Sequence, residues 1–312
     1  MDAISFEKIA DIPAFPGEYS LATRTVADDG TVLFLFVESA ASEAVFGNDT
    51  RPATYVSPAR MNAPTKFRLV GVRQDWHYVI DLPPLDASFP LVDVFPSGKV
   101  LLAAARCQWR SKDDYDLNGV VYDLATGEVS RILLGDGIER VYVDRRGIIW
   151  VSYFDEGVFG NFGWGGPGPA PIGSAGLACF SETGKKIWEA PWDIVDCYAL
   201  NVCGSEALVY YYSAFPICRV SDGFQVTRWN TALRGCHELA ATRSRVLLSG
   251  QYDDPAGVGY LGLLQQDQLK DVQRVRLLLP DGSSVPEKKS LLGRGRHMYC
   301  FDASGVYRST LE

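Results

Sequence analysis

A short apolar run that meets a tight turn and continues as a second apolar run occurs six times along the 312 residues. Clear copies lie at 26–33, 94–101 and 143–150, and weaker copies are centred at 203–205, 243–245 and 294–296. Apolar runs of this length joined by turn residues are typical of antiparallel hairpins. A hairpin that recurs every 40 to 60 residues or so, with about four strands in each period, is the pattern of blades around an axis. The sequence therefore predicts an all-β chain folded as a β-propeller.

The repeat predicts six four-stranded blades in one domain over residues 1–312, with no linker between domains. The last segment supplies only three strands, and the strand expected at 4–9 would complete it by pairing the first strand with the last, which removes an open sheet edge. Five or seven blades are the alternatives, because the segment 38–66 has no clear place in the repeat. The predicted blades cover residues 18–83, 88–135, 137–191, 193–232, 235–279 and 288–312.

The net charge and the cysteines indicate which partners are disfavoured and in which cellular compartment the protein is expected. The net charge of −8 disfavours nucleic acid and anionic membranes as partners, because both are bound through clustered Lys and Arg. No run of about 18 apolar residues is present, and the first eight residues have neither a basic leader nor an apolar core. Seven widely spaced cysteines in a chain of this size indicate reduced, mostly buried thiols. We therefore expect a cytoplasmic protein.

Loop lengths indicate which face carries function. Turns between first and second strands, and between third and fourth strands, are short, whereas the loops between second and third strands are long. In a propeller these long loops share one face with the connections between blades, so that face is elaborated for binding. It would gather residues 38–66, 106–116, 155–174 and 251–255.

Aromatic residues on these loops are the candidate binding residues. Two interpretations are open: the aromatic side chains of the Gly- and Pro-rich loop pack the loop over the axis, or they wall a pocket for a sugar, a peptide or a flat ligand. The glycine spacing of that loop does not predict a phosphate site, because no Gly-Lys-Ser/Thr ending and no helix follow it. The candidates are Trp109, Tyr115, Phe159, Phe162, Trp164 and Tyr252.

Polar residues near the starts of the innermost strands, together with Asp155 at the end of a neighbouring strand on the same face, are candidates for chemistry. Glu139, Asp155 and Asp196 would suit a divalent cation such as Ca²⁺, which prefers oxygen ligands. His237 and Glu238 are the candidate catalytic pair, with His237 as a general base. The alternative is that these charges are solvated or paired with one another, as Glu139 can be with the adjacent Arg140. The other two histidines, His77 in an outer strand and His297 at the start of an apolar run, are expected to be structural.

The segment 144–151, in which an Asp-x-x-Gly turn is followed by an apolar strand, resembles the repeats of sugar-lactone lactonases and NHL-repeat proteins. The resemblance implies a six-bladed propeller. For the lactonases it also implies a divalent cation at the axis held by carboxylate and amide ligands, a place that Glu139, Asp155 or Asp196 would fill here.

Two functions follow from these observations. The first is a soluble, non-catalytic propeller that binds an unidentified protein or small molecule through the long loops of one face. The alternative is a metal-dependent hydrolase or lactonase with a cation at the mouth of the central channel, where the metal would polarise a carbonyl group.

Overall fold

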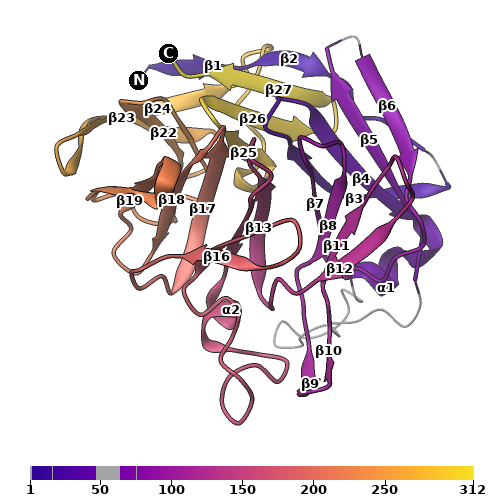
Figure 1. The fold of residues 1–312 in the computed structure, drawn as a ribbon. Helices are drawn as coiled ribbons and strands as arrows, with labels where there is room; N and C mark the ends of the chain where they lie inside the picture. The colour runs from indigo at the N-terminus through magenta and orange to yellow at the C-terminus, as the bar shows by residue number, and fades with distance from the viewer. Residues whose placement is uncertain (1, 16, 47–63, 75) are drawn as a thin grey trace. The chain divides into compact units, whose positions relative to one another are not determined.

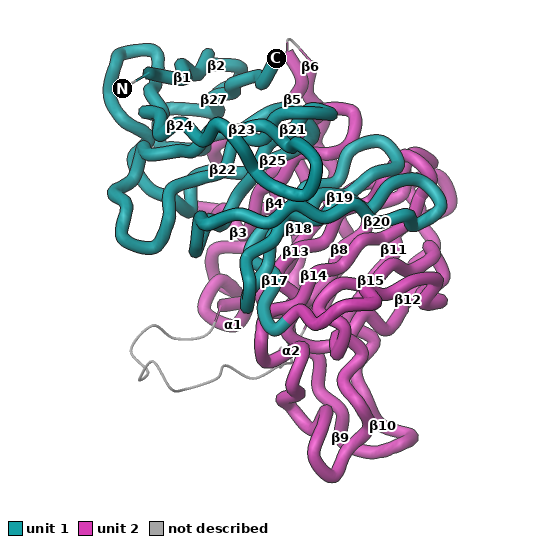
Figure 2. The backbone as a smooth tube through the Cα atoms, turned by 90° about the vertical axis from the view of Figure 1, so that its left-hand side faces the viewer, with its two compact units in different colours: residues 1–12, 195–312 teal, residues 13–194 magenta. Residues whose placement is uncertain are grey.

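The computed structural model describes residues 2–15, 17–46, 64–74 and 76–312, which form an all-β fold (Figure 1). The described strands form six blades, and each blade is built on one sheet that contains four strands of the repeat. The chain is therefore a β-propeller, as predicted. Contacts divide the chain into two compact units (Figure 2): unit 1 comprises residues 1–12 and 195–312, and unit 2 comprises residues 13–194.

The blades found in the described part of unit 2 agree with the first three predicted ones. Each is an antiparallel sheet of sequential strands, and a two-stranded hairpin is inserted between the second and third strands of the second blade. The first blade contains β3 (Tyr19–Val26), β4 (Val32–Glu38), β5 (Phe67–Arg73) and β6 (Trp76–Asp81), with η1 (Ser39–Ala41) and α1 (Ser42–Phe46) after β4. The second contains β7 (Pro90–Val94), β8 (Val100–Ala104), β11 (Gly119–Tyr122) and β12 (Val129–Ile132), with the hairpin β9 (Trp109–Ser111) and β10 (Asp114–Tyr115). The third contains β13 (Ile138–Val143), β14 (Ile149–Tyr153), β15 (Leu177–Phe180) and β16 (Lys186–Glu189), with α2 (Asp155–Phe159) after β14.

The blades of unit 1 agree with the last three predicted ones. The fourth contains β17 (Asp196–Cys203), β18 (Glu206–Tyr212), β19 (Ile217–Val220) and β20 (Val226–Trp229), with η2 (Asp222–Phe224) between the last two. The fifth contains β21 (Leu239–Ala241), β22 (Arg245–Ser249), β23 (Val258–Gln265) and β24 (Gln268–Leu278). The sixth contains β25 (Leu291–Arg294), β26 (His297–Asp302) and β27 (Gly305–Thr310), preceded by η3 (Lys288–Ser290).

The N-terminal segment completes the last blade, as predicted. Strand β2 (Glu7–Ala10) pairs antiparallel with β27, giving the sheet order β2-β27-β26-β25. Strand β1 (Ala3–Ser5) instead pairs in parallel with β24 of the fifth blade. The same short segment therefore covers the outer edges of two neighbouring sheets, edges that would otherwise offer unpaired backbone groups.

The Asp-x-x-Gly turn of the third blade has a clear physical basis. Asp144 is fully buried, and its Oδ1 accepts hydrogen bonds from the backbone N–H groups of Arg146 and Ile148 at 2.8 and 3.0 Å. Its Oδ2 accepts a 3.1 Å hydrogen bond from Nε1 of Trp150. Gly147 has a φ of +78°, which glycine adopts without strain. The carboxylate thus fixes the turn that links β13 to β14.

The core lies between the facing sheets of neighbouring blades within each unit. In unit 2, Leu35 of β4 and Leu102 of β8 belong to one buried apolar cluster, which joins the first two blades. In unit 1, Tyr210 of β18 and Leu248 of β22 belong to another. Phe6, between β1 and β2, is buried in the cluster of the last two blades. Because the faces of the sheets are buried against one another, the loops at the ends of the sheets are the parts of each blade that can vary in sequence and length.

The first strands of three blades carry a β-bulge near their beginning. Register shifts leave Ala22 of β3, Glu139 of β13 and Tyr198 of β17 without a paired residue opposite them. A bulge bends the strand and changes the direction of the side chain. These bulges lie where the first strand meets the connection from the preceding blade, which is the end of the sheet that the long loops share.

The positions of the cysteines and of two histidines agree with the sequence predictions. All seven cysteines are free thiols, and six are buried, as expected, whereas Cys203 is exposed. His77 lies in the outer strand β6 and His297 begins β26, as expected. Of the long segment 38–66, residues 47–63 lie outside the described residues. In the part of the chain that the structure describes, no helix is long and apolar enough to cross a membrane.

Candidate functional site

Arg106 is the hub of the long loops in unit 2. Its side chain is 8% exposed and forms ion pairs with Asp136 at 2.9 Å and Glu156 at 2.6 Å. Its guanidinium carbon lies 4.6 Å from the ring centroid of Phe162 and 5.4 Å from that of Phe154. Burial raises the pKa of Asp136 to about 6, although the charge of Arg106 opposes the shift. The hub joins the loop after β8, the connection from β12 to β13, and helix α2.

The Gly-rich loop folds back onto this hub. Trp164 is 6% exposed, and its Nε1 donates a 2.9 Å hydrogen bond to the backbone oxygen of Cys107. The backbone N–H of Trp109 donates to the oxygen of Phe162 at 2.9 Å, which joins the β9–β10 hairpin to the loop. A Cβ at Gly163 would lie 2.0 Å from the backbone oxygen of Trp109, so this approach requires glycine. The indole of Trp164 thus packs inside the loop.

Two other aromatic candidates of unit 2 face solvent, whereas Trp109 is half-buried. Phe159 at the end of α2 is 66% exposed, and Tyr115 on β10 is 42% exposed. Figure 1 shows that α2 and the β9–β10 hairpin both extend from the same end of unit 2. Among the described residues, neither ring lies against another aromatic ring, so Phe159 and Tyr115 are separate exposed aromatic side chains.

The predicted cation ligands do not form a recognisable set. Glu139 lies 3.6 Å from Nη1 of Arg140, and the exposed Asp155 accepts a hydrogen bond from the N–H of Glu156. Asp196 is half-buried at the start of β17 in the other unit. Among the described residues, no three His, Cys, Asp or Glu side chains are grouped as metal ligands. The cation remains a prediction, for which elemental analysis of the purified protein is the test.

Unit 1 contains a continuous cluster of aromatic rings, which we call the aromatic platform: Tyr198, Tyr212, Phe215, His237 and Tyr252. The imidazole of His237 stacks on Tyr198 with centroids 4.9 Å apart and planes 12° apart. Tyr252 meets Tyr198 and Phe215 edge-on, at 5.9 and 6.0 Å. Phe215 is buried beneath the cluster, 5.5 Å from Tyr212, whereas Tyr212 and Tyr252 are 43% and 51% exposed.

Each ring comes from the end of the sheets that the long loops share. Tyr198 is the bulged residue of β17, and the bulge re-aims its side chain. Tyr212 ends β18, and Phe215 follows in the loop to β19. His237 lies in the connection from β20 to β21, and Tyr252 in the loop from β22 to β23. Sequentially distant segments of two neighbouring blades thus supply one surface.

A polar network fixes the loop that carries Tyr252. Oδ2 of Asp254 accepts hydrogen bonds from the N–H of Gln251 and the hydroxyl of Tyr260, both at 2.9 Å, and Oδ1 accepts from Arg274 at 2.8 Å. Burial alone would raise the pKa of Asp254, but the hydrogen bonds from Arg274 and Tyr260 lower it. Nζ of Lys288 donates to the backbone oxygen of Tyr252 at 3.0 Å and also to that of Gln251. The loop is held in place before any ligand arrives.

The hydroxyl of Tyr252 lies 2.6 Å from that of Tyr198 and donates to it. Burial raises the pKa of Tyr198, and the hydrogen bond with Tyr252 raises it further, so this phenol stays neutral at physiological pH. The Tyr252 ring packs against Gly235, where a Cβ would lie 2.4 Å from Cγ of the ring. Neutral hydroxyls on a fixed ring surface offer hydrogen-bond donors without a charge.

The two residues of the predicted catalytic pair lie in different environments. His237 is exposed in the platform, whereas Glu238 is 2% exposed. Oε2 of Glu238 accepts a 2.9 Å hydrogen bond from the N–H of Gly293. The backbone N–H groups of both residues donate to the Ser249 hydroxyl, at 2.9 and 3.1 Å. Glu238 thus links sheets inside unit 1, and His237 belongs to the surface.

Tyr252 and His237 are predictable from sequence as residues of the functional face, whereas Tyr198, Tyr212 and Phe215 were not predicted. One available signal was the run of tyrosines at 210–212, which ends a strand just before a long loop. The bulge that turns Tyr198 toward the others has no marker in the sequence.

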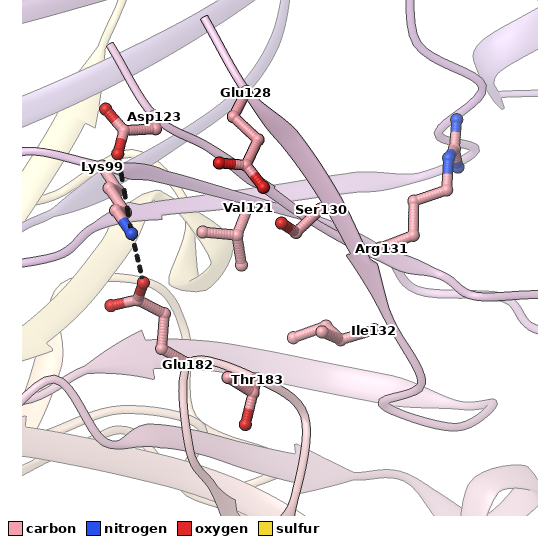
Figure 3. A pocket seen from close by; sticks show the side chains of 9 residues that line it. All are labelled: Lys99, Val121, Asp123, Glu128, Ser130, Arg131, Ile132, Glu182 and Thr183. Carbon is pink, nitrogen blue, oxygen red and sulfur yellow. Dashed lines mark hydrogen bonds and ion pairs between the residues drawn. The ribbon is translucent and has the colours of Figure 1, made fainter. Parts of the chain in front are cut away.

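A recess of about 310 Å³ lies between the third and fourth strands of the second blade and the β15–β16 turn of the third. Figure 3 shows the side chains that line it. Its lining includes an ion-pair network, in which Nζ of Lys99 lies 2.6 Å from Glu182 and 3.6 Å from Asp123. These residues lie on or beside the short turns, away from the long loops. Because the lysine is already balanced by two carboxylates, the aromatic platform is the better candidate for a ligand.

Comparison with known proteins supports the fold. No protein-family model matches the chain, and no curated protein matches it in sequence. A streptogramin B lyase structure aligns with a TM-score of 0.52 at 10% identity, covering 98% of this chain and 97% of that one. Hsv2 from Kluyveromyces lactis aligns with a TM-score of 0.51 at 10% identity, covering 91% and 74%. Virginiamycin B lyase from Staphylococcus aureus aligns with a TM-score of 0.49 at 11% identity, covering 98% and 99%. At these identities the similarity to the streptogramin B lyase structure and to Hsv2 shows the propeller fold alone, and a relation to lactonases or NHL-repeat proteins stays a prediction.

Proposed function

We propose that the protein is a cytoplasmic, non-catalytic propeller that binds its ligand on the aromatic platform of unit 1. The observation that carries the proposal is the continuity of the platform. Its rings come from strands and loops of two blades, yet each lies against the next, and Phe215 buried beneath them holds their spacing. Seven free thiols support a reducing compartment.

The composition of the platform suits recognition. Tyrosine and histidine provide a large, flat contact area with few rotatable bonds, so ordering them on binding costs little conformational entropy. The Asp254 and Lys288 network already fixes the Tyr252 loop, which lowers that cost further. Partial exposure of Tyr212 and Tyr252 leaves apolar ring surface that a ligand can remove from water.

The proposal is tested by probing the protein with an oligosaccharide array and a peptide array, and by repeating the assay with variants. Combining Tyr212→Ala with Tyr252→Ala removes the two exposed phenols, and Tyr252→Phe keeps the ring but loses the hydroxyl contact with Tyr198. Trp76→Ala is the matched control, because Trp76 is a 55% exposed aromatic residue on the outer strand β6.

We expect the double variant to bind its array ligand at least 30-fold more weakly, since loss of aromatic anchors costs about 2 kcal/mol or more. The phenylalanine variant should lose less, and the Trp76 control should match the wild type. Equal binding by the double variant and the wild type, or the absence of any bound array component, would contradict the proposal. Circular dichroism of each variant checks that it is folded.

A further inference from the structure

Arg234 lies beside the aromatic platform. Its backbone is held by hydrogen bonds, and its side chain forms no ion pair with a described carboxylate. Its N–H donates to Oε1 of Gln251 at 3.0 Å, and its backbone oxygen accepts from the N–H of Tyr252 at 3.3 Å. Its exposed guanidinium lies over the Phe215 ring, 5.9 Å from the centroid. Among the described residues, this guanidinium forms no hydrogen bond and no ion pair. Its donors are therefore available to a ligand that touches the rings.

Two cationic side chains beside the platform can pair with an anion. The chain carries a net charge of −8, yet two cations border the platform, Arg234 and Lys288. Lys288 donates to backbone oxygens, and no carboxylate within the described ranges forms an ion pair with either cation. Asp196, at the start of β17, is a carboxylate whose charge acts on the Tyr198 hydroxyl. An acidic group on a ligand would therefore be placed at the Arg234 side.

Two ring surfaces lie within the same cluster to receive the apolar part of such a ligand. His237 has one face covered by Tyr198 in a nearly parallel stack, and the residue is exposed. Tyr252 presents a half-exposed ring whose backbone is tied to Arg234. Aromatic rings bind one another in offset-stacked or edge-to-face arrangements, and guanidinium groups bind carboxylates through paired hydrogen bonds.

Building on the proposed function, we infer that the platform binds a planar ring that carries a carboxylate, with Arg234 receiving the acid. Both a free aromatic acid and the C-terminal aromatic residue of a peptide have this chemistry. In either case the ring lies against His237 and Tyr252, and the carboxylate accepts hydrogen bonds from the guanidinium.

Isothermal titration calorimetry with three probes tests the inference: phenylacetate, a tetrapeptide ending in phenylalanine with a free C-terminus, and the same tetrapeptide amidated. The informative variant is Arg234→Gln, which removes the charge and keeps a polar side chain. Arg243→Gln is the matched control, because Arg243 is another exposed arginine of unit 1, at the short turn between β21 and β22.

We expect the free acids to bind the wild type, amidation to weaken the peptide at least 10-fold, and Arg234→Gln to weaken the acids about 10- to 100-fold. The control should bind like the wild type. Tighter binding of the free-acid tetrapeptide than of phenylacetate assigns the ligand to a peptide C-terminus, and equal binding assigns it to a small acid.

The inference is overturned if no acid probe binds at millimolar concentration, or if Arg234→Gln binds the acids as the wild type does. Equal binding of acid and amide that is lost when Tyr212 and Tyr252 are replaced by alanine has a different meaning. It would exclude carboxylate recognition while supporting the platform as the ligand site.

Discussion

Replacing Asp136 with asparagine should change how the stability of the protein depends on pH. The folded-state pKa of about 6 lies above the ordinary value of 3.8, because burial disfavours the charged carboxylate more than Arg106 stabilises it. Between these two values the folded protein therefore holds a proton that the unfolded chain releases. The stabilisation is fully present below pH 3.8 and is lost as the pH rises through about 6, and it amounts to about 3 kcal/mol. The asparagine variant lacks this contribution at every pH.

Urea unfolding at pH 4.0 and 7.0, both away from the isoelectric point near 5.0, measures the effect. We expect the wild type to exceed Asp136→Asn in free energy of unfolding by about 2 kcal/mol more at pH 4.0 than at pH 7.0, because part of the contribution is already lost at pH 4.0. Asp113→Asn, which replaces an exposed acid beside the β9–β10 hairpin, serves as the control. An equal difference between the wild type and Asp136→Asn at the two pH values would refute the reasoning.

Three further predictions concern the stability of the loops and sheets. Gly163→Ala should destabilise the Gly-rich loop by more than about 2 kcal/mol, because the added Cβ would lie 2.0 Å from the backbone oxygen of Trp109. Gly166→Ala should cost about 1 kcal/mol, because no atom lies within 4 Å of the added Cβ; limited proteolysis compares the two variants, and equal cleavage rates would contradict the prediction. Asn118→Ala should lower the free energy of unfolding by about 3 to 5 kcal/mol in urea titrations, because the buried amide makes four hydrogen bonds to backbone groups that would lose their partner. Deletion of residues 2–10 should lower the melting temperature and promote concentration-dependent association seen by light scattering, because it exposes two sheet edges; an unchanged melting temperature would argue against edge protection.

The repeat could be predicted because its determinants are local. A strand shows in alternating or continuous apolar residues, and a turn such as that at Asp144 and Gly147 needs a carboxylate and a positive φ within four residues. These features do not depend on distant parts of the chain, so the six blades and the pairing of the first strand with the last follow from them. The single domain stays a prediction beside the two compact units.

The site was less predictable because its contacts are long-range. Trp164 and Tyr252 look alike in sequence, as aromatic residues on long loops. One places its indole N–H on a carbonyl group 57 residues away, and the other remains half exposed. His237 and Glu238 are adjacent, yet one is exposed and the other buried. Exposure depends on which loops meet, and the sequence pattern of a single loop does not contain that information.

The three histidines of the chain allow a direct test of where the ligand binds. Protein labelled with ¹³C in the histidine rings gives one set of imidazole resonances for each of His77, His237 and His297. On titration with the tightest-binding component of the arrays, the account predicts that the His237 resonances shift and those of His77 and His297 stay unchanged. Binding that leaves the His237 resonances unchanged would contradict the assignment of the ligand to the aromatic platform.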